Sequence, residues 1–536
     1  MDYKRFGVML DCSRNGVLTV ASVKRYIDIL SRLGYNCLML YTEDTYEIPE
    51  HPAFGYLRGR YSQKELQELD AYGRERGVEL IPCIQTLAHL NGIVRWKEFR
   101  PYVDVRDILL CEDERTYQLI EDMFRSLSVS FTSRTVNIGM DEAHMVGLGK
   151  YLREHGYQER FSVLVKHLQK VCEIAEKYGF TPIMWSDMFF RLGNNGVYTS
   201  AKPNLPTEEI LRAVPKNVEL VYWNYYASDL DCYDAMMDAH KVFENPLWFA
   251  GGLWAWTGFA PHNAISMSNT AAALAATKRH DIRNVILTVW GDDGQETSLF
   301  AILPALYYCA RAAQGQTDMD IIRADFYKEF GIEFEDFMLL DLPGTRVPEG
   351  HYASNPDKYM LYNDPFLGVF DSTVTDFVPD YTGCARKLEK LADAPEFGYL
   401  FGAMAKLCRC LAVKYDLGVR TRKVYKAGDR QAMAAIAEDY RRLLALVEEF
   451  YQAHRQRWFR ENKAFGFEVQ DLRLGALKQR LAHCAQRLDA WIAGEIAVIE
   501  ELEEEILPQH APGCKHNLWC SQVTPGALGM DYVAKI

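Results

Sequence analysis

"RTVNIGMDEAH" (residues 134–144) is the segment from which the fold assignment starts. A short apolar run, residues 135–138, is followed by two adjacent acids, Asp141 and Glu142. Such a run is typical of a strand in a parallel sheet that is covered by helices on both faces. The two acids are either solvated residues at a strand end or a pair that acts on one substrate. The rest of the chain decides between these interpretations.

Seven other apolar runs have the same form. The eight runs lie at residues 6–12, 37–43, 79–87, 135–142, 181–188, 219–226, 246–256 and 284–294. Between them lie stretches with helical spacing, such as residues 19–34 and 161–179, which end at Gly34 and Gly179, as helices often do. Eight strands that alternate with helices predict a (β/α)8 TIM barrel of the α/β class.

The predicted strand ends carry polar or aromatic side chains. They are Asp11 and Arg14, Glu43 and Asp44, Gln85 and His89, Asp141 and Glu142, Trp185 and Asp187, Trp223 and Tyr225, Trp254 and Trp256, and Trp290 and Asp292. Barrel active sites form at the carboxyl ends of the strands, so we expect these side chains to converge. Any one Trp is more commonly a core residue. As a group beside carboxylates and an arginine, the five Trp rings predict a carbohydrate pocket.

The alternation of strand and helix patterns ends after the eighth run. Residues 1–330 are predicted to form the barrel, and residues 331–536 a mainly helical C-terminal domain with a loop-rich connector. Long helical patterns dominate from about residue 380 to 508. Their many apolar positions either pack on the barrel or form the surface of a homodimer.

Composition excludes some classes of partner. The 536 residues include 60 Lys and Arg against 73 Asp and Glu, which gives a net charge of −13. Nucleic acids and anionic membranes require basic patches, so neither is an expected partner. No run of 18 apolar residues is present to span a membrane, and the first residues do not resemble a secretory signal.

Cysteine usage points to a reducing compartment. The 13 cysteines are an odd number, and several, such as Cys37 and Cys83, lie in apolar runs. Free buried thiols in the cytoplasm are therefore expected. A cluster near the end of the chain, His510, Cys514, His516 and Cys520, lacks the paired spacing of zinc ligands, so no metal site is predicted.

Six of the strand segments carry a resemblance to a known family. "NIGMDEAH" (137–144) resembles the Gly-x-Asp-Glu signature of glycoside hydrolase family 20, the β-N-acetylhexosaminidases. "GVMLDCSRN" (7–15), "CLMLYTEDTYE" (37–47) and "LIPCIQTLAH" (80–89) resemble its first three strands. "MWSDM" (184–188) resembles its Trp-Asp-Glu strand, and "VWGDDG" (289–294) its last strand. The segments are in order, and the helical tail resembles a compact bacterial subgroup without the small α/β domain that usually precedes the barrel.

The resemblance implies substrate-assisted, retaining catalysis without a metal or cofactor. The 2-acetamido oxygen of the substrate attacks C1 and forms an oxazolinium ion. Glu142 would be the general acid and then the base for water. Asp141 would accept the acetamido N–H and stabilise the developing positive charge. The two acids at the strand end would thus have different tasks on one substrate, a terminal β-linked GlcNAc or GalNAc.

The same resemblance assigns the supporting residues. Asp44 and His89 match an acid–histidine pair that tunes and orients the general acid, although a His at this place can also be structural. Asp292 matches a residue that binds the outer hydroxyls of the sugar. Trp185, Trp223 and Trp290 match the walls of the pocket.

Two positions depart from the family pattern. Phe6 occupies the place of the substrate-binding Arg, and Arg5 points to the other face if the register holds, so Arg14 is the proposed replacement. The seventh strand, "FAGGLWAWTG" (249–258), has no Tyr to hold the acetamido oxygen, and Tyr225 on the neighbouring strand is the alternative.

Two other functions are compatible with the residues. One is a barrel β-glycosidase with a carboxylate nucleophile, in which Asp187 or Asp292 would lie ~5–5.5 Å from Glu142. The other is a sugar-binding barrel that has lost activity, although the presence of both Asp141 and Glu142 speaks against it.

Overall fold

The computed structural model of the protein describes residues 3–192, 198–292, 294–346, 355–374 and 376–507. The cluster of His510, Cys514, His516 and Cys520 lies outside these residues. The chain forms two compact units, which are described separately. The first unit comprises Met1–Leu253, Ile265–Trp290 and Ala305–Asp318, and the second comprises Trp254–Ala264, Gly291–Pro304 and Met319–Ile536.

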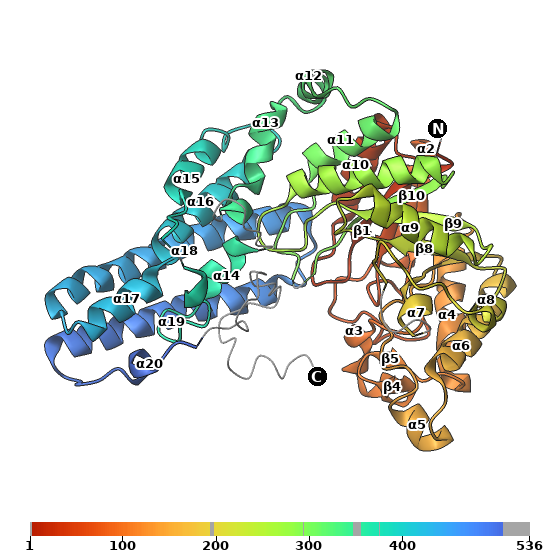
Figure 1. Ribbon diagram of the computed structural model, residues 1–536, viewed down its shortest axis with the longest axis horizontal. Helices are drawn as coiled ribbons and strands as arrows, with labels where there is room; N and C mark the ends of the chain where they lie inside the picture. The colour runs from red at the N-terminus through yellow and green to blue at the C-terminus, as the bar shows by residue number, and fades with distance from the viewer. Residues whose placement is uncertain (1–2, 193–197, 293, 347–354, 375, 508–536) are drawn as a thin grey trace. The chain divides into compact units, whose positions relative to one another are not determined.

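Eight parallel strands close into a barrel in the first unit (Figure 1). They are β1 (Arg5–Asp11), β2 (Cys37–Tyr41), β3 (Glu79–Cys83), β6 (Thr135–Asn137), β7 (Thr181–Trp185), β8 (Glu219–Trp223), β9 (Leu247–Gly252) and β10 (Asn284–Val289). The barrel closes between the first and last strands, with pairs running from Arg5↔Asn284 to Leu10↔Val289. The predicted TIM barrel is confirmed, and its strands are almost fully buried, as the near-continuous apolar runs require.

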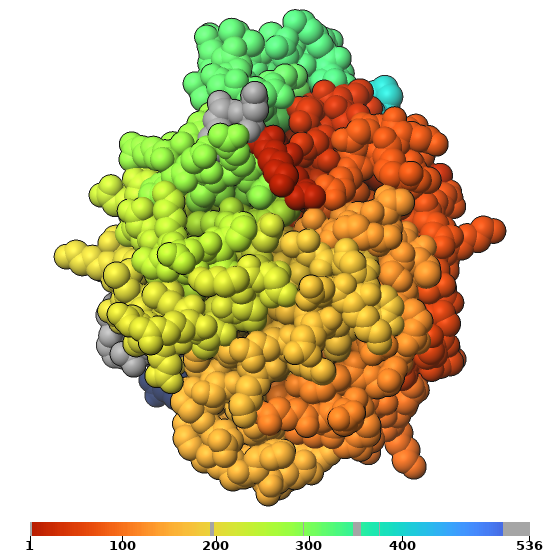
Figure 2. All heavy atoms as spheres, turned by 90° about the vertical axis from the view of Figure 1, so that its right-hand side faces the viewer, coloured from red at the N-terminus to blue at the C-terminus, as the bar shows by residue number. Residues whose placement is uncertain are grey.

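Helices follow the strands along the chain. They are α1 (Val20–Leu33), α2 (Gln63–Glu75), α3 (Asn91–Val94), α4 (Glu114–Ser130), α5 (Lys150–His155), α6 (Arg160–Lys177), α7 (Asp187–Arg191), α8 (Glu208–Ala213), α9 (Leu230–Lys241), α10 (Asn263–Arg279) and α11 (Leu303–Ala313). A short antiparallel pair, β4 (Val103–Val105) and β5 (Ile108–Leu109), follows β3. Figure 2 shows side chains of the first unit, orange to yellow, forming a continuous outer surface.

The residues that cap helix α1 could be recognised in the sequence. The Thr19 hydroxyl accepts a hydrogen bond from the Ser22 backbone N–H and caps the start of α1. Gly34 adopts a left-handed conformation, with φ of 87°, and its N–H caps the end. The predicted end at Gly34 is confirmed.

The second unit is helical. Its helices are α12 (Met319–Phe330), α13 (Phe334–Phe337), α14 (Pro356–Tyr362), α15 (Tyr381–Glu389), α16 (Gly398–Lys414), α17 (Leu417–Lys426), α18 (Arg430–Glu461), α19 (Phe467–Ala493) and α20 (Glu500–Glu503). The long helices α18 and α19 pack against each other, and α16 packs against α15 and α18. The predicted C-terminal helical domain is confirmed. Across the described residues, no helix combines the length and apolarity needed to cross a membrane.

Two loops of the barrel sequence belong to the second unit. Residues 254–264 follow β9 and residues 291–304 follow β10, and both cluster with the helices of the second unit. They carry three of the predicted sugar-binding residues, Trp254, Trp256 and Asp292.

Candidate active site

A left-handed turn presents the two acids. Strand β6 ends at Asn137, and Gly139, Met140 and Glu142 then have φ values of 73°, 70° and 51°. A Cβ at Gly139 would lie 2.1 Å from Gln85 Oε1, so only glycine fits there. Non-glycine residues rarely adopt such backbone conformations, and they cluster at functional sites. The turn releases Asp141 and Glu142 from the strict alternation of a strand.

Asp141 is held as an ionised carboxylate. It is buried, its Oδ1 accepts a 2.7 Å hydrogen bond from Gln85 Nε2, and its Oδ2 lies 3.2 Å from His89 Nε2. Burial alone would raise the pKa of Asp141, but the charge of His89 and these hydrogen bonds lower the pKa below its usual value. A carboxylate kept in this form can balance a positive charge that develops on a substrate.

His89 is the cationic partner of the two acids. Its Nε2 lies 3.7 Å from Glu142 Oε2 as well as 3.2 Å from Asp141. Burial lowers the pKa of His89, but the charge and hydrogen bonding of Asp141 outweigh burial and raise the pKa to about 9. His89 therefore carries a positive charge at neutral pH.

Asp44 is not the partner of His89 that the resemblance implied. Its Oδ1 accepts a 3.3 Å hydrogen bond from Arg58 Nε, and the described contacts of the His89 ring are to Asp141 and Glu142. The backbone of Gly92 lies against the Asp44 carboxylate, where a Cβ would be 2.0 Å from Oδ2. The structure thus replaces the expected Asp44–His89 pair with an Asp141–His89 pair.

Glu142 is the accessible member of the acid pair. Its side chain is 45% exposed, whereas that of Asp141 is 11% exposed. The Glu142 carboxylate reaches solvent, while its backbone N–H donates to Asp187 Oδ2 at 3.2 Å. The carboxyl group is therefore accessible to a molecule from solvent.

Asp187 holds the backbone of the turn at Glu142 through a hydrogen bond. Its side chain is fully buried, and its Oδ2 also accepts a 3.1 Å hydrogen bond from Arg191 Nε. Burial and the nearby charge of Asp141 raise the pKa of Asp187 to about 7. The sequence marked this residue as a strand-end acid and as an alternative nucleophile. Its position on α7, next to Trp185, was the signal that could have assigned it a supporting role.

Arg14 lies against the rings of Trp290 and Tyr41 at the carboxyl ends of the strands. The Arg14 guanidinium lies 5.2 Å from the ring centroid of Trp290 and 5.4 Å from that of Tyr41. Its Nε donates to Glu43 Oε1 at 3.0 Å, and the Tyr41 hydroxyl donates to the same oxygen. Arg5, in contrast, pairs with Glu79 at the amino ends of β1 and β3. Arg14 thus lies beside aromatic rings near the carboxyl ends of the strands, whereas Arg5 lies at their amino ends.

Tyr41, Glu43 and Gln85 contact these residues and were not assigned a role in the site. Gln85 Nε2 donates to the Tyr41 hydroxyl at 3.0 Å as well as to Asp141. Gln85 and Glu43 were visible in the sequence only as polar strand ends. Their contacts link the Arg14 cluster to Asp141.

The aromatic residues of β7, β8 and β10 lie together. The ring centroids of Trp185 and Trp290 are 6.2 Å apart, and Trp223 stacks on Tyr225 at 5.2 Å. The buried Tyr225 side chain is hydrogen-bonded to Trp290 and Thr288. Trp185 is almost fully buried, and Trp223 is more accessible. The structure therefore brings together eight predicted site residues of the first unit: Arg14, His89, Asp141, Glu142, Trp185, Trp223, Tyr225 and Trp290.

The remaining predicted residues belong to the second unit. Trp254 and Trp256 pack together with ring centroids 5.0 Å apart, and Trp254 also meets His262 edge to face. Asp292 follows β10 by three residues and is partly exposed. Among the described residues, no group of three or more His, Cys, Asp or Glu side chains has the arrangement of a metal site.

Two family models match the chain. Residues 3–245 match the model "Glycosyl hydrolase family 20, catalytic domain", and residues 335–519 match "Glycoside Hydrolase 20C C-terminal domain". Together these segments include most of the chain. The chain belongs to glycoside hydrolase family 20. Residues 246–334, which include β9, β10 and the two loops of the second unit, lie outside both matches.

Several characterised proteins are similar to this family 20 member. Hexosaminidase D of Bos taurus is 21% identical over 347 residues, which cover 60% of this chain and 92% of the relative. Hexosaminidase D of Homo sapiens is 24% identical over 307 residues, which cover 53% of this chain and 60% of the relative. The crystal structure of a β-N-acetylhexosaminidase from Bacteroides fragilis aligns with a TM-score of 0.49 at 17% identity, over 62% of this chain and 71% of that one.

Proposed function

We propose that this protein is an exo-acting, retaining β-N-acetylhexosaminidase that removes terminal β-linked GlcNAc or GalNAc from glycans. The observation that carries the proposal is the division of the acid pair: Asp141 is buried and held ionised by His89 and Gln85, while Glu142 is exposed. Family membership and the similarity to proteins named hexosaminidases support it.

In the first proposed step, the acetamido carbonyl oxygen of the substrate attacks C1. The bond between C1 and the glycosidic oxygen breaks, and Glu142, in its acid form, gives its proton to that oxygen. The product is a cyclic oxazolinium ion, and the aglycone leaves. Asp141 accepts the acetamido N–H, and its negative charge stabilises the positive charge of the ring as it forms.

In the second step, water attacks C1 from the face that the aglycone left. Glu142, now a carboxylate, takes a proton from this water, and the bond between C1 and the acetamido oxygen breaks. The acetamido group is restored, and the sugar leaves with its β configuration retained. His89 Nε2 lies 3.7 Å from Glu142 Oε2 and would orient the carboxylate that accepts this proton.

We propose supporting roles for the other residues of the site. Arg14, Trp185, Trp223, Tyr225 and Trp290 would line the sugar pocket, and His89 would orient both acids. Trp254, Trp256 and Asp292 would contribute from the loops after β9 and β10, with Asp292 on the outer hydroxyls. The helical domain is proposed to form a homodimer surface.

A carboxylate nucleophile is the less favoured mechanism. Asp187 is the alternative nucleophile that belongs to the first unit, but both described partners of its Oδ2, Glu142 N–H and Arg191, hold it inside the protein. A carboxyl group with a pKa of about 7 is partly protonated at neutral pH and is a weak nucleophile in that form.

The stereochemistry of the reaction tests the proposal. An aryl β-GlcNAc substrate is hydrolysed in an NMR tube, and the anomer of GlcNAc that forms first is recorded before mutarotation. The β anomer is expected first. Appearance of the α anomer first would exclude a retaining enzyme, and absence of hydrolysis would exclude the function.

The compartment and subgroup are also proposed rather than established. We propose a cytoplasmic protein, because the eleven cysteines among the described residues are all free and buried. The net charge of −13 supports a neutral glycan as partner and opposes nucleic acid or an anionic membrane. We also propose that the protein belongs to a compact bacterial subgroup of the family.

A further inference from the structure

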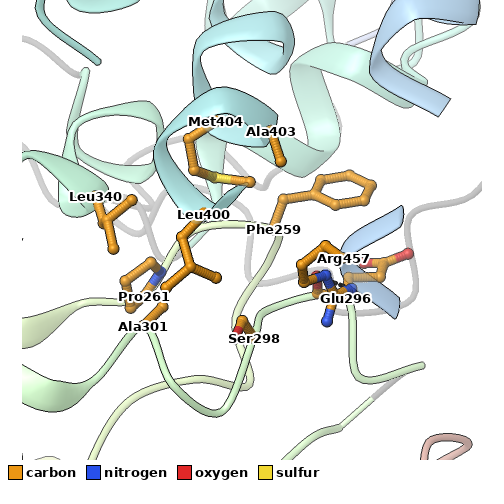
Figure 3. Close-up of a pocket in the computed structure, with 10 residues that line it drawn as sticks. All are labelled: Phe259, Pro261, Glu296, Ser298, Ala301, Leu340, Leu400, Ala403, Met404 and Arg457. Atoms are coloured by element: carbon orange, nitrogen blue, oxygen red, sulfur yellow. Dashed lines mark hydrogen bonds between the residues drawn. The ribbon is translucent and has the colours of Figure 1, made fainter. Parts of the chain in front are cut away.

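The loop after β10 carries a buried acid with three cationic partners. Glu296 is 3% exposed, and its Oε2 lies 2.7 Å from Lys358 Nζ while its Oε1 accepts from Arg473 Nη1 at 2.9 Å. Its backbone carbonyl oxygen accepts from Arg457 Nη2 at 3.1 Å (Figure 3). These three cations come from α14, α18 and α19, so three separate helices of the second unit hold one loop residue.

Helix α19 also contacts the loop backbone next to Asp292. Gln470 Nε2 donates to the Gly294 carbonyl oxygen at 3.1 Å. Gly294 has a φ of 122°, and a Cβ there would lie 2.5 Å from Arg473 Nη1. This φ favours glycine, and the absence of a side chain allows the close approach of Arg473. The backbone two residues after Asp292 is fixed between Gln470 and Arg473.

The loop after β9 is held by the same unit. Asp357 Oδ2, on α14, accepts hydrogen bonds from the backbone N–H groups of Phe259 and Ala260 at 2.7 and 2.9 Å. Thr297 donates to the Gly258 carbonyl oxygen at 2.6 Å, which joins the two loops to each other. The loops that carry Trp254, Trp256 and Asp292 thus form one body with α14, α18 and α19.

There is little room for either loop to move. The cavity between the loops and the helices, lined by Phe259, Ser298, Leu400 and Arg457 among others, has a volume of about 10 Å³, enough for one water molecule (Figure 3). Taking charges out of water is costly, so a buried set of this kind is weak evidence for stability alone. A requirement for one fixed loop conformation explains the buried charges around Glu296 better than stability does.

We propose that Arg473, Lys358 and Arg457 are positioning residues for substrate binding, which act through Glu296 on the loop that carries Asp292. This inference rests on the proposed function and deepens it, because it assigns the helical domain a part in recognition of the outer hydroxyls of the sugar. These residues do not touch the substrate. They fix the position of the loop that carries Asp292, which is the residue proposed to contact the sugar.

The test compares Arg473→Met with a matched control on the same helix. Arg480 also lies on α19 and pairs with Asp364, at 2.7 Å, away from both loops. Arg480→Met therefore removes a similar ion pair without touching the Glu296 cluster. Steady-state kinetics with aryl β-GlcNAc and thermal unfolding are measured for the wild type and both variants.

Arg473→Met is expected to raise KM by about ten- to hundredfold with a much smaller change in kcat, because contacts to the outer hydroxyls act in ground and transition states alike. Arg480→Met should leave KM unchanged. Asp292→Asn combined with Arg473→Met should be no worse than Asp292→Asn alone, since both changes remove the same contact. Equal KM effects of Arg473→Met and Arg480→Met, or additive effects of Arg473→Met and Asp292→Asn, would overturn the inference.

Two further measurements keep the inference testable. If Arg473→Met does not fold, Gln470→Met removes the hydrogen bond to Gly294, together with a contact to His454 on α18, and should raise KM in the same direction. Hydrogen exchange of residues 294–304 should be faster in either variant than in Arg480→Met, and unchanged exchange would overturn the inference. A wild type that does not hydrolyse aryl β-GlcNAc would instead refute the proposed function, so the two failures are distinguishable.

Discussion

Replacing Asp141 with Asn separates the charge of this side chain from its shape. The amide oxygen can still accept the 2.7 Å hydrogen bond from Gln85, so the turn should keep its conformation. The negative charge 3.2 Å from His89 Nε2 is lost. If Asp141 only closes a strand, catalysis should be nearly unaffected. If it balances the oxazolinium charge, the chemical step should suffer.

The structure gives the size of the effect on His89. The charge and hydrogen bonding of Asp141 are the leading influences that raise the pKa of His89 from 6.5 to about 9, against burial and Arg14, which lower it. In Asp141→Asn, the pKa of His89 should therefore fall to 6.5 or below. A change of this size corresponds to about 3 kcal/mol, at about 1.36 kcal/mol for each pKa unit.

The catalytic loss should be of similar size. Removing one preorganised group from a developing charge costs ~10²–10³-fold in kcat in other enzymes, which is about 3–4 kcal/mol. We expect this loss in kcat with a modest change in KM, because the interaction strengthens toward the transition state. A thiazoline that mimics the oxazolinium ion should inhibit the wild type strongly and the variant weakly.

Two assays check this prediction. NMR titration of ring-labelled histidines, with His89→Gln to assign the signal, follows the pKa of His89 in both proteins. Kinetics with aryl β-GlcNAc and inhibition by the thiazoline follow catalysis. An unchanged pKa of His89 would refute the electrostatic coupling, and an unchanged thiazoline affinity would return Asp141 to a structural role.

Three other predictions concern Glu142, Asp187 and the helical domain. Glu142→Gln should lose ~10²–10⁴-fold activity on glycosides with poor leaving groups and far less on activated aryl glycosides; equal losses would exclude the acid role. Asp187 has a pKa raised from 3.8 to about 7 by burial and Asp141, so its ionisation destabilises the folded protein and the free energy of unfolding should fall as pH rises from about 4 to 7. Asp187→Asn should remove part of that pH dependence in thermal unfolding, and parallel pH profiles of both proteins would contradict it. If the helical domain forms a dimer surface, sedimentation at micromolar concentration should give twice the 61.5 kDa mass of the chain, and a monomer would reject the dimer.

The sequence predicted the fold well because the barrel depends on local patterns. Alternation of apolar runs and amphipathic stretches is set within a few residues, and Gly34 marks a helix end by its own conformational freedom. The Asp-Glu pair was also evident, because it stands at the end of such a run.

The finer geometry depends on backbone strain and on contacts distant in sequence. The left-handed φ of Met140 and Glu142 has no sequence signal, so the exposure of Glu142 was not anticipated. The partner of His89 proved to be Asp141 rather than Asp44, which only the packing of strand ends could decide. Glu296 and Arg473 are 177 residues apart, and no local pattern pairs them.

The rates of hydrolysis of two substrates that differ only at C2 distinguish substrate-assisted catalysis from catalysis by an enzyme nucleophile. Aryl β-GlcNAc carries the acetamido group that attacks C1, whereas the matching aryl β-glucoside carries a hydroxyl group there. We predict that kcat/KM is higher for the β-GlcNAc substrate by about 10³-fold or more, since an intramolecular nucleophile is lost in the glucoside. Equal or faster turnover of the glucoside would contradict substrate-assisted catalysis.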